Sequence, residues 1–564
     1  MRIRLVSFVT FPIIAAGCAG VVASGDGSGA LGVGQTEEAL GFALTPVPTA
    51  NPKSPGLTTA TALSPELIQT AAAQGSIPVE NPASVTTASG AVVDIRFYGY
   101  MNDGPLMPLP GDVQSATHNV EASKTEPDKN TYLVLEGQKG ADATYDYGRH
   151  FLFQGHEVGK AGYITRVNLD ADRAHRVTVM ASVDKNGAPI PTIDGSTWDP
   201  FAKRLLFTTE SGGNASVVEA TLDFPSVVED ISGATGRGGY EGVQNDSDGN
   251  VWIVEDVGGK AGTASPHAKQ PNSFVYRFVP KSPMDLTRGK LQALQVISLR
   301  TGQPIAFHAG QADADILSPD VGDLHTYGTV FDTKWVTLHD TDVDGTAPFD
   351  ANALGKAKLA TPFKRPENGQ FRPDGKFREF FFDETGDTNA LTEAGAGFGG
   401  FGSIMRLVQK SPSADTGKLN LFYLSDVVHS GFDNTSFWSK DQIVFVEDAG
   451  DTLHTQRNAL DSAYVFDVRV DYSDPANQPV RIIAEGRDPS ATIDSALGGS
   501  PGFQNEGDNE ITGFHVSNGD PRREGILGAS PPRVFEDGWR AFYTAQHGDN
   551  VTWEILPARG RFDD

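Results

Sequence analysis

Cysteine is nearly absent from this chain, in which Cys18 is the only one among 564 residues. A single thiol cannot close a disulfide within one chain, so the fold has to be held together by its buried core. Long helical patterns are also rare, and the zinc-protease helix motif with two histidines and a glutamate does not occur. These absences exclude a disulfide scaffold and that class of zinc enzyme.

Positive charge is scarce as well. The chain has 45 Lys and Arg residues against 72 Asp and Glu residues, which gives a formal net charge of −27. Nucleic acid is therefore not an expected partner, because its binding needs a basic patch and none is evident. The acidic excess has two interpretations, a surface that keeps the protein soluble or a protein that collects cations.

No apolar run is long enough to cross a membrane as a helix. The apolar stretch from Leu5 to Ala16 follows Arg2 and Arg4, and this order is typical of an export signal. The letters "AAGC", ending at Cys18, resemble a bacterial lipobox, whose cysteine carries lipid. We expect residues 1–17 to be a lipoprotein-type signal peptide and Cys18 to anchor the protein to a bacterial outer membrane or cell surface. The alternative is an ordinary cleaved signal peptide and a periplasmic or secreted protein.

Residues 18–91 are dominated by Gly, Ala, Ser, Thr and Pro. Such a composition buries little apolar surface and predicts a flexible tether. One short helix is expected within it at "SPELIQTAAAQG", with Ser64 as the N-cap, Pro65 in the first turn and Gly75 at the end.

From residue 92 onward, short apolar strands alternate with turns rich in Gly, Asp, Asn and Pro, which predicts an all-β domain over residues 92–564. Several strands end in acidic residues, and one ends in a glutamine and a histidine at the same place. These endings are Glu136, Glu210, Glu255-Asp256, Asp383-Glu384, Glu447-Asp448 and Gln546-His547.

Four of these endings have an acidic partner at a regular distance upstream. Glu241 precedes Glu255 by 14 residues, and the midpoint falls beside Gly249, a strong turn signal. The other pairs, 14 or 16 residues apart, are Asp433 with Glu447, Glu367 with Asp383, and Asp194 with Glu210. Because residues equidistant from a hairpin turn face each other, each hairpin should carry an acidic pair at its open end.

Six related hairpins in one chain favour radial repetition, a β-propeller with long insertions between its strands. The first strand of every blade would line the central channel, and the open ends would converge on one mouth. We expect six blades, and seven remains open because the domain is long for six. A pair of β-sandwiches is the alternative fold, which explains the strands but not the repeated acids.

Carboxylates crowded at one mouth repel each other unless a cation neutralises them. Ligands that are all oxygen favour a hard ion, and Ca²⁺ takes six to eight oxygens. The opposite interpretation is that each acid is only a solvated strand end. The predicted metal ligands are Glu136, Glu210, Glu241, Glu255, Asp256, Glu367, Glu447 and Asp448.

Two further motifs are less specific. Asp340, Asp342, Asp344 and Gly345 form the first half of an EF-hand-like loop, but Ala351 stands where that loop needs an acid. A peripheral calcium site and a metal-free turn are both open there. The pair His156-Glu157 is interpreted as part of a loop rather than as a ligand site.

Several segments resemble the PhoX-type alkaline phosphatases. "TPFKRPENGQ" is similar to their Arg-Pro-Glu motif, and "GRGGYEGVQ" to a Gly-Arg…His-Glu segment, with Tyr240 where histidine is usual. "FVYRFVP" and "GSIMRL" resemble two strands of that family. "RAFYTAQHGDN" resembles its last blade, with Gln546-His547-Gly548-Asp549 where Gln-His-Pro-Gly is usual. The resemblance extends over most of residues 95–555.

The resemblance implies an exported six-bladed propeller that holds calcium and iron in its channel and hydrolyses phosphomonoesters. It implies that Glu241 and Glu367 are metal ligands, that Arg365 lies at the site, and that His547 belongs to it. This chain has Thr209-Glu210-Ser211 where the family has a Cys-Glu-Glu strand end, so the thiolate that the family uses on iron is missing.

We therefore expect a monomeric, exported phosphomonoesterase centred on several Ca²⁺ ions, with Arg365 and His547 as its catalytic residues and iron left open. Two alternatives remain, a non-catalytic surface propeller stapled by calcium and a lactonase-like propeller hydrolase.

Overall fold

Antiparallel strands are the main regular secondary structure in the described part of the chain. The computed structural model describes residues 44–53, 60–102, 122, 124–157, 159–210, 215–486, 510–547 and 550–558. All of these belong to the second of the chain's two units, which runs from Ala39 to Asp564, whereas the first is Met1–Glu38. The expected signal peptide and Cys18 lie outside the described residues. No helix in the described ranges is long and apolar enough to span a membrane.

The first two four-stranded sheets follow the chain in simple order. The first contains β5 (Thr131–Val134), β6 (His150–Gln154), β7 (Ile164–Asn168) and β8 (Val177–Ala181). The second contains β9 (Ser196–Asp199), β10 (Arg204–Thr208), β11 (Val217–Ala220) and β12 (Val228–Asp230). Each strand pairs with the next along the chain, the meander expected of a propeller blade.

The next nine strands form one sheet, whose two edge strands are β13 and β18. They are β13 (Tyr240–Asn245), β14 (Val251–Glu255), β15 (Val275–Ser282), β16 (Asp285–Val296), β17 (Val330–Asp340), β18 (Gly369–Phe371), β19 (Glu379–Glu384), β20 (Ser403–Gln409) and β21 (Thr416–Leu424). The order is β13-β14-β15-β16-β17-β21-β20-β19-β18, so β17 joins two four-stranded meanders at their outer strands.

The last two sheets each take a strand from the N-terminal part of the chain. One contains β22 (Phe432–Phe437), β23 (Gln442–Glu447), β24 (Ser462–Asp467), β25 (Val480–Ala484) and β1 (Ala62–Leu63). The other contains β26 (Ile511–Ser517), β27 (Arg540–Ala545), β28 (Val551–Pro557) and β2 (Leu67–Ala73). A hairpin of β3 (Pro78–Thr86) and β4 (Val92–Phe97) contacts β8.

Helices are short and lie in the connections. They are α1 (Ser232–Thr235), α2 (Ala312–Ile316), α3 (Pro319–Leu324), α4 (Thr341–Asp344), α5 (Ala351–Ala357) and α6 (Gly450–Arg457). Three 3₁₀ turns cover Arg173–His175, Ala396–Phe398 and Arg523–Gly525.

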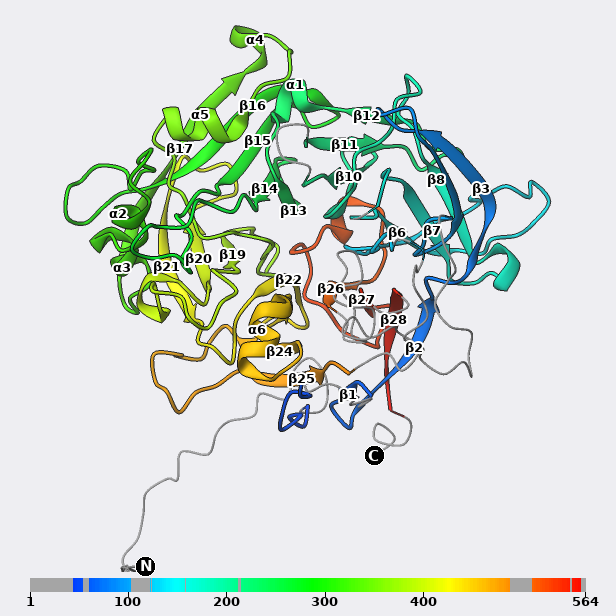
Figure 1. Cartoon of the computed structure of the whole chain (residues 1–564). Coiled ribbons are helices and arrows are strands. Elements are labelled where there is room, and N and C mark those ends of the chain that lie inside the picture. The colour runs from blue at the N-terminus through cyan, green and yellow to red at the C-terminus, as the bar shows by residue number, and fades with distance from the viewer. Residues whose placement is uncertain are drawn as a thin grey trace, which may run out of the picture. The chain divides into compact units, whose positions relative to one another are not determined.

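The first strands of the meanders close a ring. β5 contacts β9, β9 contacts β13, β13 contacts β18, β18 contacts β22, β22 contacts β26, and β26 contacts β5. The sheets radiate from this ring (Figure 1), so the fold is a β-propeller, as the repeated hairpins predict. Among the described residues, six inner strands make these contacts.

The hydrophobic core packs one sheet against its neighbour. Within the nine-stranded sheet, Trp252 of β14 lies edge-on to Trp335 of β17 at 5.1 Å and to Phe371 of β18 at 4.9 Å between ring centroids. Edge-to-face aromatic pairs of this kind add to the stabilisation from buried area. They fix the two meanders relative to each other and hence the ends of β13 and β18.

The predicted tether is wrong over its described part. β2 pairs with β28 along its length, from Leu67 opposite Pro557 to Ala73 opposite Thr552. The helix expected between Ser64 and Gly75 is this strand, because β28 offers an unpaired edge whose hydrogen bonds override a weak local helix preference. The N-terminal strands thus complete the last two sheets and join the two ends of the domain.

Candidate metal centre

One acidic side chain stands at the start of each inner strand of the ring. Glu241 and Asp433 are the second residues of β13 and β22, and the other four lie one to three residues before β5, β9, β18 and β26. Five of them are at most 6% exposed, and the acid before β26 is half-buried. The six inner-strand acids are Asp128, Asp194, Glu241, Glu367, Asp433 and Glu510.

Carboxylate oxygens from the inner strands and their neighbours gather into three groups. In each group, one oxygen from each of three residues lies within 4.8 Å of the other two. Asp194 and Glu241 each belong to two groups, so the groups form a continuous arc of oxygens at one mouth of the ring. The groups are Asp128 with Glu157 and Asp194, Asp194 with Glu210 and Glu241, and Glu241 with Glu367 and Asp433.

Burial and mutual repulsion raise the pKa values of carboxyl groups in the arc, so their ionised forms are destabilised in the fold. Burial, followed by the charge of Asp194, raises the pKa of Glu241 well above its usual value. Burial, followed by the charge of Asp256, does the same to the pKa of Glu367. Burial raises the pKa of Asp128 to about 6 despite its hydrogen bond from Thr512. A bound cation would reverse this cost, because it favours the ionised form of every carboxylate around it.

The donor set of the arc fits a hard cation. All seven residues in the three groups offer carboxylate oxygens, and one of these, Glu367 Oε1, is buried without a hydrogen bond in the described structure. Calcium takes oxygen donors of this kind. The one protein cation beside Glu367 Oε1 in the described residues is Arg365, whose Nη2 lies 3.1 Å away. No cysteine belongs to the groups, and the chain's single cysteine is residue 18. The fit is therefore to Ca²⁺ rather than to iron bound through a thiolate.

Arg365 lies beside the arc and is held by two acids. Its Nε and Nη2 donate to the carboxylate of Asp256, with the shortest distance 2.6 Å, and Nη2 lies 3.1 Å from Glu367 Oε1. The side chain is 18% exposed, so part of the guanidinium faces solvent. The backbone of Arg365 has φ +61°, a left-handed conformation that a non-glycine residue rarely adopts.

His547 and its neighbour reach the opposite side of the arc. His547 Nε2 lies 3.1 Å from Glu510 Oε2 and 3.9 Å from Glu126 Oε1. Gln546 Nε2 donates to Glu157 Oε2 at 3.2 Å. His547 also has a left-handed backbone, with φ +65°. The structure therefore brings both predicted catalytic residues to the acid-lined mouth.

Lys129 is a fixed internal cation beneath the arc. Its Nζ donates to the carbonyl oxygens of Thr435 at 3.2 Å and Phe514 at 3.3 Å. Burial lowers the pKa of Lys129 to about 8, and the charges of Asp433 and Asp128 oppose that shift. The ammonium offsets part of the negative charge where β22 and β26 meet. Sequence reasoning missed this residue, whose only signal is its place next to Asp128.

Two predicted metal ligands face away from the arc. Glu255 Oε2 accepts hydrogen bonds from the backbone N–H of Phe274, the hydroxyl of Tyr276 and Asn352 Nδ2, and burial raises its pKa to about 8. Glu447 accepts from both terminal nitrogens of Arg457, each at 3.1 Å. Both carboxylates already have protein partners within the sheet packing.

The reason is a one-residue bulge in β13 and another in β22, the inner strands of these two hairpins. Tyr240 pairs with Glu255 and Phe432 with Glu447, whereas the register further along would put Glu241 and Asp433 opposite them. The prediction that the hairpin acids face each other is therefore wrong by one residue. Because a shift of one residue moves a side chain to the other face, each inner-strand acid separates from its expected partner. Asp256 and Asp448, the next residues along, are electrostatic neighbours of Glu367 instead.

Glu136 also lies outside the arc, as do Glu255, Asp256, Glu447 and Asp448 among the predicted ligands. It follows β5, which is a first strand, so it lies at the far end from Asp128, forms an ion pair with Arg149 and has a side chain that is 74% exposed. Its expected place at the mouth is wrong. The equivalent second strand in this blade is β6, and the acid three residues after it is Glu157, interpreted from sequence as part of a loop. The arc also contains Asp128, which sequence reasoning missed.

The EF-hand-like loop has protein cations as its partners. Asp342 pairs with Lys281 and lies 3.6 Å from Arg288, and Asp340 lies 3.3 Å from Lys290. Asp344 accepts a hydrogen bond from the backbone N–H of Asp340. These contacts favour the metal-free turn over a calcium site.

Comparisons with known proteins add a likeness of fold. No protein-family model and no curated protein matches the chain. PhoX from Pseudomonas fluorescens, solved in complex with vanadate, a transition state analogue, has 11% sequence identity and a TM-score of 0.50, over 90% of this chain and 98% of that chain. A gluconolactonase from Xanthomonas campestris has 13% identity and a TM-score of 0.35, over 87% of this chain and 100% of that chain. At such identity the likeness to PhoX shows a shared propeller fold, and the lower score carries no argument.

Proposed function

We propose that this chain is a metal-dependent hydrolase of phosphomonoesters, with its site in the acid-lined mouth of the propeller. The observation that carries the proposal is the arc of three linked carboxylate groups with Arg365 beside it. An arginine fork matches phosphate oxygens, and a cation cluster offsets their charge, so the two together suit a phosphate ester better than a neutral substrate.

Each group in the mouth has a distinct proposed role. Glu241, Glu367 and Asp433 would hold Ca²⁺ together with the two groups that continue the arc. Bound Ca²⁺ would supply positive charge for the ester oxygens. Arg365, aligned by Asp256, would direct its solvent-facing N–H groups at the same oxygens. His547, whose Nε2 lies 3.1 Å from Glu510, would contact the phosphate and give a proton to the leaving oxygen.

Two independent likenesses support this reading. The sequence order Arg365-Pro366-Glu367 resembles the motif of the PhoX-type phosphatases, and the solved PhoX structure of similar fold binds vanadate, a transition state analogue. At 11% identity the activity of that protein does not carry over by itself. The proposal therefore depends on the arc and on a direct measurement.

The test measures metal content and turnover together. Purified protein is assayed with p-nitrophenyl phosphate before chelation, after chelation, and after readdition of Ca²⁺ or iron, and bound metal is counted by mass spectrometry. We expect calcium to copurify, chelation to abolish turnover and Ca²⁺ to restore it. Glu367→Gln should lose both metal and turnover, while the matched control Glu136→Gln, an exposed acid at the far end of β5, keeps both. Turnover that survives complete chelation would overturn the proposal.

A non-catalytic propeller stapled by calcium is the second candidate, and the lack of a thiol among the ligands favours it. In that case chelation lowers the melting temperature, but no phosphomonoester is cleaved at any metal loading. A lactone panel run beside the phosphate esters distinguishes a lactonase-like hydrolase.

We further propose that the protein is exported and carries lipid on Cys18. The experiment is metabolic labelling with an alkyne fatty acid followed by membrane fractionation. Cys18→Ala should abolish the label and release the protein from the membrane fraction, and equal labelling of both proteins would contradict the proposal.

A further inference from the structure

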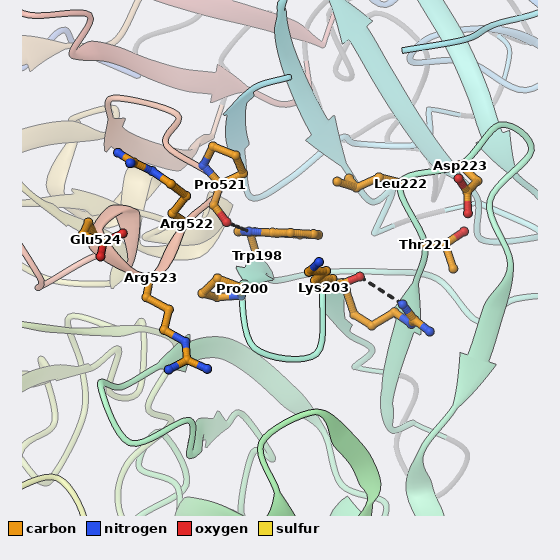
Figure 2. Close-up of a pocket in the computed structure, with 11 residues that line it drawn as sticks. Trp198, Pro200, Lys203, Thr221, Leu222, Asp223, Pro521, Arg522, Arg523 and Glu524 are labelled. Atoms are coloured by element: carbon orange, nitrogen blue, oxygen red, sulfur yellow. Dashed lines mark hydrogen bonds between the residues drawn. The ribbon is translucent and has the colours of Figure 1, made fainter. Parts of the chain in front are cut away.

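A pocket of about 640 Å³ lies beside the β9–β10 and β11–β12 turns (Figure 2). Asp194 precedes β9 and Glu210 follows β10, whereas the pocket is lined by the β9–β10 turn and the β11–β12 turn. Residues 521–524, from the connection between β26 and β27, form its third side. Its volume falls in the range of small-molecule sites, roughly 300–1,000 Å³. The pocket is therefore separate from the proposed metal centre.

An anchored tryptophan forms the apolar wall of this pocket. Trp198 Nε1 donates a hydrogen bond to the carbonyl oxygen of Pro521 at 2.7 Å, which fixes the orientation of the indole. Figure 2 shows the N–H edge directed at Pro521 and the ring extending toward Leu222 and Lys203. Pro200, Leu222 and Pro521 complete the apolar lining. A half-buried indole of fixed orientation is a flat platform for a ring-shaped ligand.

Some of the charged side chains around the pocket are already engaged. Arg522 forms an ion pair with Asp520 at 2.7 Å. Arg204 Nη1 donates to the carbonyl oxygen of Lys203 at 3.1 Å, and its Nε lies 3.5 Å from Glu219. These two guanidinium groups are therefore not the main attraction for an anion.

The remaining charges at the pocket balance. Lys203 and Arg523 are exposed cations, the latter with its guanidinium 4.0 Å from the ring centroid of Phe201. Asp223 and Glu524 are exposed acids in the same lining. A strongly charged ligand would meet like charge from one of these pairs. A neutral ligand whose groups both donate and accept hydrogen bonds could use side chains of both signs.

We propose that this pocket binds a neutral sugar ring of a short oligosaccharide. A sugar presents an apolar C–H face, which packs on the Trp198 platform, and hydroxyl groups along its edge. Those hydroxyls donate to Asp223 and accept from Lys203, which Figure 2 draws on the Leu222 side of Trp198. The inference does not rest on the metal centre, because none of the lining residues belongs to the arc.

The test titrates the full chain, with its metals, with defined saccharides. Maltose, cellobiose and N,N′-diacetylchitobiose are the neutral probes, glucose 6-phosphate is the anionic probe and glucosamine the cationic one, all followed by calorimetry. We expect at least one neutral disaccharide to bind in the millimolar range or tighter. Trp198→Leu should weaken that binding roughly tenfold, because the stacking platform is lost.

Asp223→Asn provides a second variant that keeps the fold, since this side chain is exposed. It should weaken the same saccharide severalfold. Its matched control is Asp285→Asn, another exposed aspartate in a hairpin at the same end of the neighbouring sheet, which should leave binding unchanged. Phosphomonoesterase activity is measured in parallel and should be the same in all three variants.

Three results would overturn the proposal. The first is that no neutral probe binds at about 10 mM, a concentration that reveals even weak affinity. The second is that a neutral probe binds but its affinity is unchanged in both Trp198→Leu and Asp223→Asn. The third is that glucose 6-phosphate binds more tightly than every neutral sugar and that this binding is lost in Lys203→Gln, which would make this an organic-anion site instead.

Discussion

The two acids of one hairpin have opposite surroundings. Asp433 on β22 faces the channel, where burial and then the charge of Asp128 raise its pKa well above the usual value. Glu447 on β23 faces the sheet packing and accepts hydrogen bonds from Arg457 and the backbone N–H of Ser430. The difference teaches that a buried acid at a strand end is not by itself a metal ligand. What differs is the kind of neighbour: Glu447 is paired with a guanidinium, whereas Asp433, among the described residues, accepts only from the neutral amide of Asn434 and has other carboxylates beside it.

The same contrast recurs in the hairpin of β13 and β14. Glu255 takes three hydrogen bonds from protein donors, whereas Glu241 shares its surroundings with Asp194 and Glu367. The sheet-facing acids have protein hydrogen-bond donors, although burial raises the pKa of both Glu255 and Glu447 above the usual value. The channel-facing acids oppose folding unless a cation joins them.

The largest expected effect comes from breaking the sheet-facing pair. Glu447→Ala leaves Arg457, whose side chain is 6% exposed, without its two-pronged partner. Removal of one member of a buried ion pair costs about 3–5 kcal/mol, so we expect a loss of that size in the free energy of unfolding, measured by urea denaturation. Asp461, at 3.3 Å from Arg457, moderates the loss.

The control for this change is Glu136→Ala, an acid of the same type with an exposed ion pair. Its free energy of unfolding should change by less than about 0.5–1 kcal/mol. Equal effects of the two substitutions would remove the distinction between partnered and unpartnered acids.

A pH effect comes next in size, and it concerns a buried base on an inner strand rather than a buried acid. Burial, followed by the charge of Lys129, lowers the pKa of His515 on β26 to about 3, and its Nε2 accepts a hydrogen bond from the backbone N–H of Tyr132. The unfolded histidine titrates near 6.5, so below that pH the unfolded chain binds the extra proton. The contribution of His515 to stability should therefore fall as pH decreases from about 6.5 toward 3, by roughly 2 kcal/mol at pH 5, while the buried acids with raised pKa values act in the opposite direction.

His515→Gln removes this contribution while it keeps an acceptor for Tyr132. Urea denaturation at pH 7.5 and pH 5 should show a smaller loss for the variant than for the parent. Identical losses in the two proteins would show that His515 does not stay neutral in the fold.

A smaller change is expected at a channel-facing acid, where substitution should increase the stability of the metal-free protein rather than decrease it. Glu241→Gln removes one charge from the arc, so the metal-free protein should gain about 1 kcal/mol in the free energy of unfolding, because one repelled carboxylate is gone. The increase in melting temperature on addition of Ca²⁺ should shrink or vanish at the same time, because ligand binding to the folded state is the source of that increase. Thermal melts in chelator and in calcium measure both.

A variant that loses stability in chelator and keeps the full calcium response would contradict this. It would mean that Glu241 is partnered within the protein, as Glu255 is, and the contrast between the two faces would disappear.

Much of the fold could be predicted from sequence because alternation and turns are local. The hairpin around Gly249 and the repeated endings at Glu210 and Asp448 led to radial repetition and to a common mouth. β2 could not be predicted in this way. Its residues are mostly alanine and threonine, and only the edge of β28, almost 500 residues away, makes it a strand.

The ligand set was harder to predict than the fold because register decides it. A single bulge residue after Tyr240 decides which acid faces the channel. Gly242 lies in that stretch and is a residue type that often marks a bulge, but the bulged stretch between Phe432 and Thr435 has no glycine. The same difficulty put Glu136 into the predicted set and left Glu157 out, since both end an apolar strand followed by a loop. Which strand is first in its blade depends on pairing with the neighbouring strands, not on local composition.

The smallest expected effect concerns the loop whose sequence most resembles a calcium site. Asp342→Asn breaks the ion pair with Lys281, an exposed pair whose loss should change the free energy of unfolding by less than about 1 kcal/mol. The number of calcium ions bound per chain, counted by mass spectrometry after equilibrium dialysis, should stay the same, because lysine and arginine already neutralise this acid. A drop of one calcium ion would show that the loop binds metal despite these cations. The contrast between Asp433 and Glu447, in which the acid paired with a protein cation is not the metal ligand, would then fail outside the channel.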